Sequence, residues 1–160
     1  INSDTRNDLL ANTLTLVATA EKKDVVTMDT LTSADVESIA IGEIEAVPAG
    51  KYASQVFENM SITDAVSDKI VYAKDVKAVL NYVEAGDADC GFVYRTDALL
   101  LDEENGAIIG DVDESLHDPI VYPAAIMADA PQADYAADFY EFMQCHFPKS
   151  VFAQYGFTVK

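Results

Sequence analysis

The chain has 160 residues, of which 50% are hydrophobic and 9% aromatic, and this composition argues for a folded globule and against a disordered chain. Its 28 acidic and 10 basic residues give a formal charge of −18, which argues against nucleic acids and anionic lipid surfaces as partners. An anionic ligand must therefore be held by local geometry, because the long-range field of the chain repels it. The length suits one domain or a piece of a larger protein.

Short apolar segments alternate with helical patterns along the chain. Strands are predicted for residues 12–19, 36–43, 69–75, 87–94, 106–112 and 119–127. Apolar residues recur at helical spacing in SQVFENM from Ser54, in DVKAVLNYVEAG from Asp75 and in ADYAADFYEFM from Ala133. Strands that alternate with helices predict βαβ units, a mainly parallel sheet with flanking helices, and the α/β class.

Capping residues refine the predicted helices. Gly86 follows the helical pattern that starts at Asp75, where a left-handed residue commonly ends a helix. Ser33 is predicted to cap a short helix in the polar segment after the first strand. The C-terminal segment, residues 133–155, is predicted to form two helices, each with an apolar face. These helices need a sheet to pack on, so we expect part of the fold to lie upstream of this sequence.

Sequence signatures of enzymes are absent from the chain. It contains no GxSxG, HExxH, CxxC, P-loop or GxGxxG motif. His117 and His146 lie in polar or chain-end contexts, and we interpret both as exposed side chains, with a catalytic role as the alternative. The run Asp102-Glu103-Glu104 indicates a solvated loop rather than a metal site. We therefore predict no enzyme, no catalytic residue and no metal site.

The two cysteines stand in different apolar segments. Cys90 and Cys145 belong to no CxxC motif and have no neighbouring pair of histidines. Free cysteine is among the most buried residue types. We predict that both are packed thiols, in preference to a disulfide or a pair of metal ligands.

Two predicted helices begin directly after predicted strands. The first begins at Ala49 and Gly50, after a strand that ends near Gly42, and the second begins at Asp75 and Val76. In a parallel sheet both helix N-termini lie along the carboxyl edge, where open α/β folds bind ligands. Each N-terminus offers free N–H donors and about half a positive charge. The pattern therefore predicts an anion site at this edge.

Other side chains fall near the same edge. Tyr94 ends the strand GFVY, and its hydroxyl is a candidate neutral donor, with a core aromatic as the alternative. Four of the ten basic residues, Lys51, Lys74, Lys77 and Arg95, lie within two positions of Ala49, Val76 or Tyr94. This clustering biases the edge toward anions, although lysine is also common on any exposed first turn of a helix.

Several blocks of sequence together resemble a known family. The blocks AIGEIEAVPAGKYA, YAKDVKAVLNYVEAGDADCGFVYRTDA, DPIVYPAAIM and FAQYGF are similar, in order and spacing, to the molybdate-binding protein of bacterial ABC importers. The resemblance runs from about Leu9 to the C-terminus. It implies a type II periplasmic-binding-protein fold, in which two α/β lobes close on the ligand.

The resemblance also implies a ligand and a set of donors. Family members bind a tetrahedral molybdate or tungstate through neutral donors, without a cofactor, a metal counterion or a salt bridge. By position the donors are the backbone N–H groups of Ala49 and Val76 and the hydroxyl of Tyr94. The neighbours expected to support them are Gly50, Asp75, Lys51, Lys77 and Arg95.

The domain ranges expected from the resemblance follow the two lobes. Residues 1–20 form a crossover strand into the second lobe, residues 21–119 form that ligand-binding lobe, and residues 120–160 return to the first lobe. The first part of lobe one has no counterpart in this sequence. We therefore expect a missing N-terminal lobe segment as a partner, weak molybdate binding by the chain alone, and self-association through uncovered helix faces.

The expected setting is an importer outside the cytoplasm. No apolar run approaches the ~20 residues of a membrane span. The resemblance implies a periplasmic or extracellular protein that delivers its ligand to an ABC transporter permease, with any membrane anchor in a segment upstream. Two alternatives stay open: a ligand-sensing effector domain of a transcriptional regulator, and a receptor for another anion such as sulfate, phosphate or a carboxylate.

Overall fold

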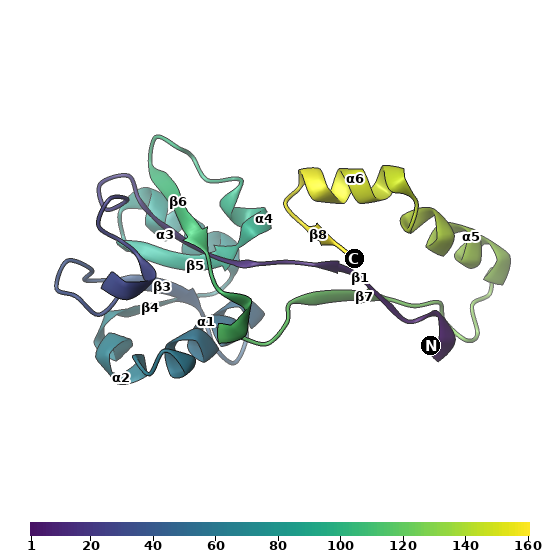
Figure 1. The fold of residues 1–160 in the computed structure, drawn as a ribbon, viewed down its shortest axis with the longest axis horizontal. Coiled ribbons are helices and arrows are strands. Elements are labelled where there is room, and N and C mark those ends of the chain that lie inside the picture. The colour runs from purple at the N-terminus through teal and green to yellow at the C-terminus, as the bar shows by residue number, and fades with distance from the viewer. The chain divides into compact units, whose positions relative to one another are not determined.

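The computed structural model describes residues 1–160 as two compact units (Figure 1). Unit 1 comprises Ile1–Asn12 and Pro119–Lys160, and unit 2 comprises Thr13–Asp118. The lobe ranges 1–20, 21–119 and 120–160 concern a complete receptor and stay a prediction. No helix in either unit combines the length and apolarity needed to cross a membrane.

Unit 2 is built on a five-stranded sheet with the order β4-β3-β5-β2-β6. Its strands are β2 (Leu14–Thr19), β3 (Ile39–Gly42), β4 (Ile70–Ala73), β5 (Cys90–Tyr94) and β6 (Gly106–Asp111). Strand β3 is parallel to β4 and β5, whereas β2 is antiparallel to both β5 and β6. Only β2 therefore runs against the other strands, which confirms the predicted α/β class with a mainly parallel sheet.

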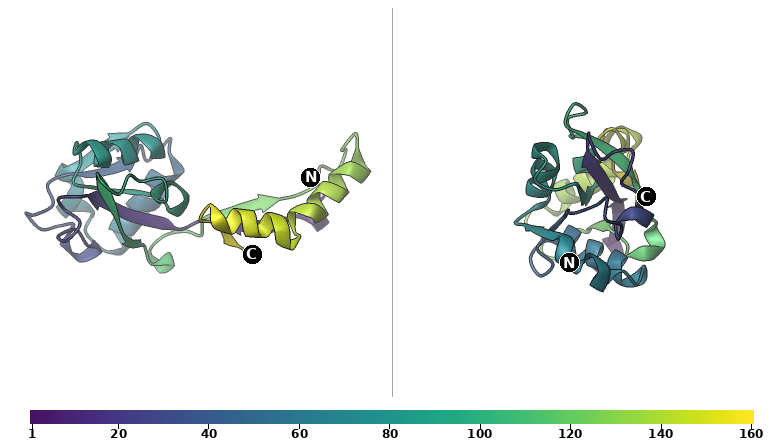
Figure 2. Two further views of the ribbon diagram at one scale, coloured as in Figure 1. Left: turned by 90° about the horizontal axis from the view of Figure 1, so that it is seen from above. Right: turned by 90° about the vertical axis from the view of Figure 1, so that its left-hand side faces the viewer.

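Helices cover both faces of this sheet (Figure 2). Unit 2 contains α1 (Pro48–Asn59), α2 (Thr63–Val66), α3 (Val76–Ala85), α4 (Arg95–Ala98) and the 3₁₀ turns η2 (Met28–Thr30), η3 (Ser67–Lys69) and η4 (Glu114–Leu116). A Cβ on Gly91 would lie 2.7 Å from Val79 of α3, whereas the ring of Phe92 packs against that of Phe57 of α1 at 5.4 Å. Because successive strand residues point to opposite faces, α3 and α1 lie on opposite sides of β5.

Helix α3 is capped at both ends, and its C-terminal cap is the predicted Gly86. The Asp75 side chain accepts a hydrogen bond from the N–H of Ala78, and Gly86 ends the helix with a φ of 77°. Between these ends, Val79 and Val83 are fully buried in the core of unit 2. Glycine suits the left-handed φ at the helix end because it has no Cβ.

The helix predicted after Ser33 is wrong. The only helical turn in that segment is η2, which lies before Ser33 and is capped by Thr27. The side-chain amine of Lys69 donates to the carbonyl oxygens of Leu31 at 3.1 Å and Ser33 at 2.6 Å. The Ser33 carbonyl also accepts the N–H of Val36 at 3.4 Å, so it takes part in a single turn and a lysine contact, and no helix follows.

Unit 1 contains a three-stranded antiparallel sheet with the order β7-β1-β8. Its elements are η1 (Ser3–Thr5), β1 (Asn7–Ala11), β7 (Val121–Ala124), α5 (Ala133–Met143), α6 (His146–Gln154) and β8 (Thr158–Val159). The two predicted C-terminal helices and the strand predicted from Pro119 are present as α5, α6 and β7. Strands β1 and β8 were not predicted from the sequence.

The two thiols differ in burial. Cys90 is fully buried in β5, and burial, with a smaller contribution from the Asp89 carboxylate, raises its pKa to about 12. Cys145 is a free thiol that is exposed at the junction of α5 and α6. The prediction of a packed thiol is therefore confirmed for Cys90 and wrong for Cys145, because a position between two helices belongs to neither apolar face.

Two glycines allow α1 to begin against the end of β3. A Cβ on Gly50 would overlap the carbonyl oxygen of Gly42, and a Cβ on Gly42 would overlap the side chain of Val47. The backbone of the first turn of α1 therefore lies directly on the last residue of β3.

We expect Gly50→Ala to lower the free energy of unfolding of unit 2 by about 3 kcal/mol, because the added methyl group meets backbone instead of a flexible side chain. Urea denaturation followed by circular dichroism measures the effect. Gly110→Ala is the matched control, because a Cβ there meets nothing within 4 Å. Equal stability of the two variants would contradict the close approach of α1 to β3.

Candidate anion-binding site

Three strands of the unit 2 sheet end side by side at one edge. Gly42 at the end of β3 is in register with Ala73 at the end of β4, and Ala40 is in register with Gly91 of β5. Helix α1 follows β3, α3 follows β4, and α4 begins directly after Tyr94. The structure therefore brings Ala49, Val76 and Tyr94 to the same edge of the sheet.

The first turn of α1 leaves one backbone donor uncommitted. The N–H groups of Gly50 and Lys51 donate to the carbonyl of Val47, at 2.9 and 3.3 Å. Pro48 has no N–H, and the N–H of Ala49 donates to no other group of the chain. Val47 supplies no side-chain cap. Because Ala49 is buried, an acceptor from a ligand would satisfy a donor that the fold leaves unpaired.

The first turn of α3 offers a comparable donor. Its cap residue Asp75 accepts the N–H of Ala78 at 2.7 Å through its side chain and the N–H of Val79 at 3.2 Å through its carbonyl. The N–H of Val76 donates to no other group of the chain. Asp75 therefore caps the helix, and its carboxylate is not a donor to an anion.

The third position, Tyr94, is held by backbone contacts on β2. Tyr94 pairs with Leu14 in the sheet, and the following residue, Arg95, donates its N–H to the carbonyl of Thr13 at 2.8 Å. The tyrosine is half-buried and occupies the cap position of α4. Its place at the end of a core strand fixes its Cα relative to the ends of β3 and β4.

The basic residues near this edge differ in how they are engaged. Lys51, Lys74 and Lys77 are exposed and form no ion pair, so their charges bias the edge toward anions. The guanidinium of Arg95 lies 3.3 Å from the carboxylate of Asp111. Arg95, predicted to support the anion site, is therefore engaged by a carboxylate of the same unit.

A contact network that the sequence did not predict fastens α1 to the segment 116–118. Gln55 donates to the Asp118 carboxylate at 2.7 Å and accepts the N–H of Asp118 at 2.9 Å, and Asn59 donates to the carbonyl of Leu116 at 2.8 Å. Gln55 and Asn59 are four residues apart, so they share one face of α1. This helix spacing was the available sequence signal.

His117 belongs to the same segment and corrects the prediction of two exposed histidines. Only 8% of its surface is exposed, and its ring packs on that of Tyr52 at 5.6 Å. Its Nδ1 lies 2.8 Å from the carbonyl of Asp118, whereas its Nε2 is buried without a hydrogen-bond partner. His146, in contrast, is exposed.

The helices of unit 1 do not begin directly after a strand, so they bring no pair of N-termini to one sheet edge. Unit 1 has a hollow of about 350 Å³ whose lining is mostly apolar and includes Ile126, Phe139 and Met143. No cluster of three or more His, Cys, Asp or Glu residues could hold a metal ion. The edge formed by β3, β4 and β5 is therefore the best candidate for an oxyanion.

A family model described as bacterial extracellular solute-binding protein matches residues 1–158. The chain belongs to this family. The E. coli molybdate-binding protein ModA is 32% identical over 166 residues, an alignment that covers 100% of this chain and 63% of ModA. The Bacillus subtilis protein YvgL, whose name ascribes it to ABC transporter substrate-binding lipoproteins, is 41% identical over 153 residues, covering 96% of this chain and 58% of YvgL. The chain therefore spans about three fifths of the length of these relatives.

Solved structures agree with this assignment. A Clostridium difficile substrate-binding domain, ascribed to a molybdenum ABC transporter, is 39% identical, with a TM-score of 0.90 over 100% of this chain and 69% of that one. The periplasmic molybdate-binding protein of Azotobacter vinelandii is 20% identical, with a TM-score of 0.76 over 99% of this chain and 69% of that one. The second similarity shows the fold alone. The resemblance found in the sequence and the type II periplasmic-binding-protein fold are confirmed.

The capping role of Asp75 leads to a prediction. Asp75→Ala removes the acceptor of the Ala78 N–H and should lower the free energy of unfolding by about 1 kcal/mol. Asp75→Asn keeps an acceptor and should cost much less, and urea denaturation compares the two. If the alanine and asparagine variants lose the same stability, the carboxylate acts through its charge and the capping assignment is wrong.

Proposed function

We propose that the chain is the ligand-binding part of an extracytoplasmic receptor that binds molybdate or tungstate and delivers it to the permease of an ABC importer. The observation that carries the proposal is the pair of uncommitted N–H groups, on Ala49 and Val76, at the sheet edge where Tyr94 ends β5. Membership of the solute-binding family and the names of the relatives support it. The proposed role is binding and transport, without a catalytic step or a cofactor.

Neutral donors suit the charge of this chain. At a formal charge of −18 the whole protein repels a dianion, so binding must come from short-range contacts. Each N–H or O–H donor to an oxyanion makes a charge-assisted hydrogen bond of about 1.5–3 kcal/mol. The proposed donors are Ala49, Val76 and Tyr94. Gly50 keeps the first turn in place, and Lys51 and Lys77 contribute a local positive field.

The proposed donors surround only part of a tetrahedral anion. We propose that the remaining donors come from a further segment that would complete the length of the relatives, and that this segment lies on the N-terminal side, as the resemblance in the sequence implies. Molybdate should therefore bind tightly to the complete receptor, meaning this chain joined to that segment, and weakly to residues 1–160 alone. A receptor for sulfate is the main alternative, and a sulfate titration distinguishes it.

We expect Tyr94→Phe in the complete receptor to weaken molybdate binding at least tenfold, because one hydroxyl donor to the anion is lost. Isothermal titration calorimetry with molybdate and with sulfate measures the change. Tyr72→Phe is the matched control, since Tyr72 lies on edge strand β4 with 48% of its surface exposed.

Ala49→Pro provides a second variant, because it deletes the N–H of Ala49 without changing a charge. Together with Tyr94→Phe it should abolish measurable binding. A folded wild-type receptor that gives no heat with molybdate would rule out the molybdate assignment. Wild-type binding that sulfate matches would instead favour the receptor for another anion.

We further propose that the same additional segment, which would complete the length of the relatives, covers the apolar side chains of unit 1. Three aromatic side chains each expose more than 60% of their surface: Tyr135 and Phe139 of α5 and Phe147 of α6. Such exposure is unusual for large apolar residues whose helices pack on a complete hydrophobic core. The same chemistry accounts for the self-association expected of the chain alone.

Sedimentation velocity tests this proposal on residues 1–160 and on the complete receptor. The chain alone should form concentration-dependent oligomers, because association removes the exposed aromatic rings from water. The complete receptor should sediment as a monomer. Phe139→Ser with Phe147→Ser should shift the isolated chain toward the monomer. A monomeric isolated chain would contradict the proposal.

A further inference from the structure

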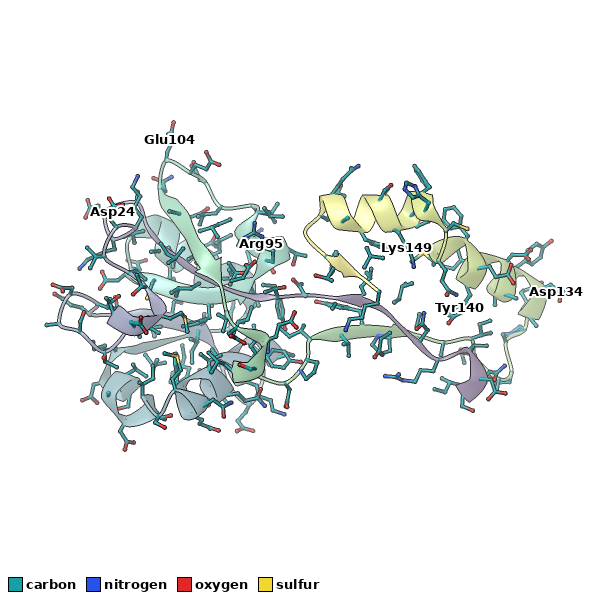
Figure 3. All side chains as sticks on the ribbon, viewed as in Figure 1. Asp24, Arg95, Glu104, Asp134, Tyr140 and Lys149 are labelled. Atoms are coloured by element: carbon teal, nitrogen blue, oxygen red, sulfur yellow. The ribbon has the colours of Figure 1, made fainter.

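Arg95 follows the proposed ligand residue Tyr94, but its charge is held by Asp111. The Nη1 atom of Arg95 lies 3.3 Å from Oδ1 of Asp111. The hydroxyl of Thr15 donates to the same carboxylate oxygen at 2.8 Å. Figure 3 labels Arg95 among the side chains of unit 2. Two donors, one from β2 and one from the first residue of α4, therefore converge on one oxygen of Asp111.

The strand order determines the direction in which Arg95 is held. Strand β2 lies between β5 and β6, and Thr15 pairs with Val93 on one side and with Asp111 on the other. Asp111 therefore lies two strand spacings from β5, a distance of about 10 Å. Strands β3 and β4, which lead to Ala49 and Val76, are on the other side of β5. The ion pair draws the guanidinium away from both backbone donors.

The Arg95 and Asp111 side chains are 35% and 49% exposed, but both ends of the pair are attached to ordered parts of unit 2. Thr15 is fully buried, and its neighbours in β2, Leu14 and Leu16, are core residues. The backbone of Arg95 is fixed by its hydrogen bond to the carbonyl of Thr13. An exposed ion pair without such support contributes little to stability, because water solvates both charges almost as well. Here a buried hydroxyl orients the carboxylate that receives the arginine.

We propose that Asp111, oriented by Thr15, is a specificity-determining positioning residue that withholds the charge of Arg95 from the anion site. A free guanidinium binds sulfate, phosphate and carboxylates bidentately, with little regard for the placement of neutral donors. Holding it on β6 leaves selection to the neutral donors, whose spacing can discriminate between anions. The inference rests on the proposed oxyanion site.

Calorimetric titrations of molybdate and sulfate into the complete receptor test the inference. Asp111→Asn keeps the size of the side chain and an acceptor for Thr15 but removes the charge that pairs with Arg95. We expect sulfate to bind about tenfold more tightly to this variant, as one unpaired charge near a dianion would produce at surface dielectric. The affinity for molybdate should rise less, so the selectivity of the receptor for molybdate over sulfate should fall. The gain should disappear in Asp111→Asn with Arg95→Gln and shrink at high salt.

Asp113→Asn is the matched control. It makes the same change of charge two positions away, where the carboxylate accepts the N–H of Ser115 and forms no ion pair with arginine. The inference is overturned if sulfate affinity is unchanged in Asp111→Asn, if the gain persists without Arg95, or if Asp113→Asn produces it equally. Should Asp111→Asn fail to fold, Thr15→Val removes only the orienting hydroxyl and should give a smaller gain that also requires Arg95.

Failure of the proposed function gives a different result. A wild-type receptor that ignores molybdate would rule out the molybdate assignment. An Arg95-dependent gain of sulfate binding in Asp111→Asn would still support the withholding of charge, and its absence would overturn it. The wild-type titration and the variant comparison therefore decide the two proposals separately.

Discussion

The candidate anion site depends on the close approach of α1 to the last residue of β3. Only a glycine at position 50 lets the helix backbone lie on the carbonyl of Gly42. That approach sets where the first turn begins, and Pro48 with the uncapped Val47 then leaves the N–H of Ala49 without an acceptor. The close contact between the two backbones thus places a backbone N–H without an acceptor at the sheet edge. The contacts of Gln55 and Asn59 with the segment 116–118 hold the rest of the helix in place.

Two charged side chains near this edge have partners of their own, whereas the three lysines form no ion pair. Asp75 caps its own helix, and Arg95 is paired with Asp111. What remains for a ligand is a set of neutral N–H donors with exposed lysines at the periphery. For a chain of formal charge −18 this arrangement matters, because an attractive field cannot supply the affinity and contact geometry must. Contact geometry is also what allows similar anions to be told apart.

Local sequence predicted the parts of the fold that local rules determine. The strands that became β2 to β7, the Gly86 cap of α3 and the helix starts after β3 and β4 follow from periodicity and capping chemistry. Strands β1 and β8 were missed, since β8 has only two residues and both strands form by pairing with segments that are distant in the sequence. The helix predicted after Ser33 was wrong: the Ser33 carbonyl is in a single turn with Val36 and also accepts from Lys69, 36 residues away, a contact that has no local signal. The burial of His117 depends on Tyr52 of α1 and has no local signal.

The same distinction applies within the candidate site. Ala49, Val76 and Tyr94 each stand at a junction between a strand and a helix, so their placement at one edge required only the order of elements. The engagement of Arg95 required the register of β2 with both β5 and β6, which brings together residues 16 positions apart. The position of Arg95 next to Tyr94 in the sequence suggested that its guanidinium contacts the anion. The register of the sheet instead places the guanidinium beside Asp111, with which it forms an ion pair. The positions of the candidate donors can thus be predicted from the local order of strands and helices. The pairing of Arg95 with Asp111 can be predicted only from the register of the assembled sheet.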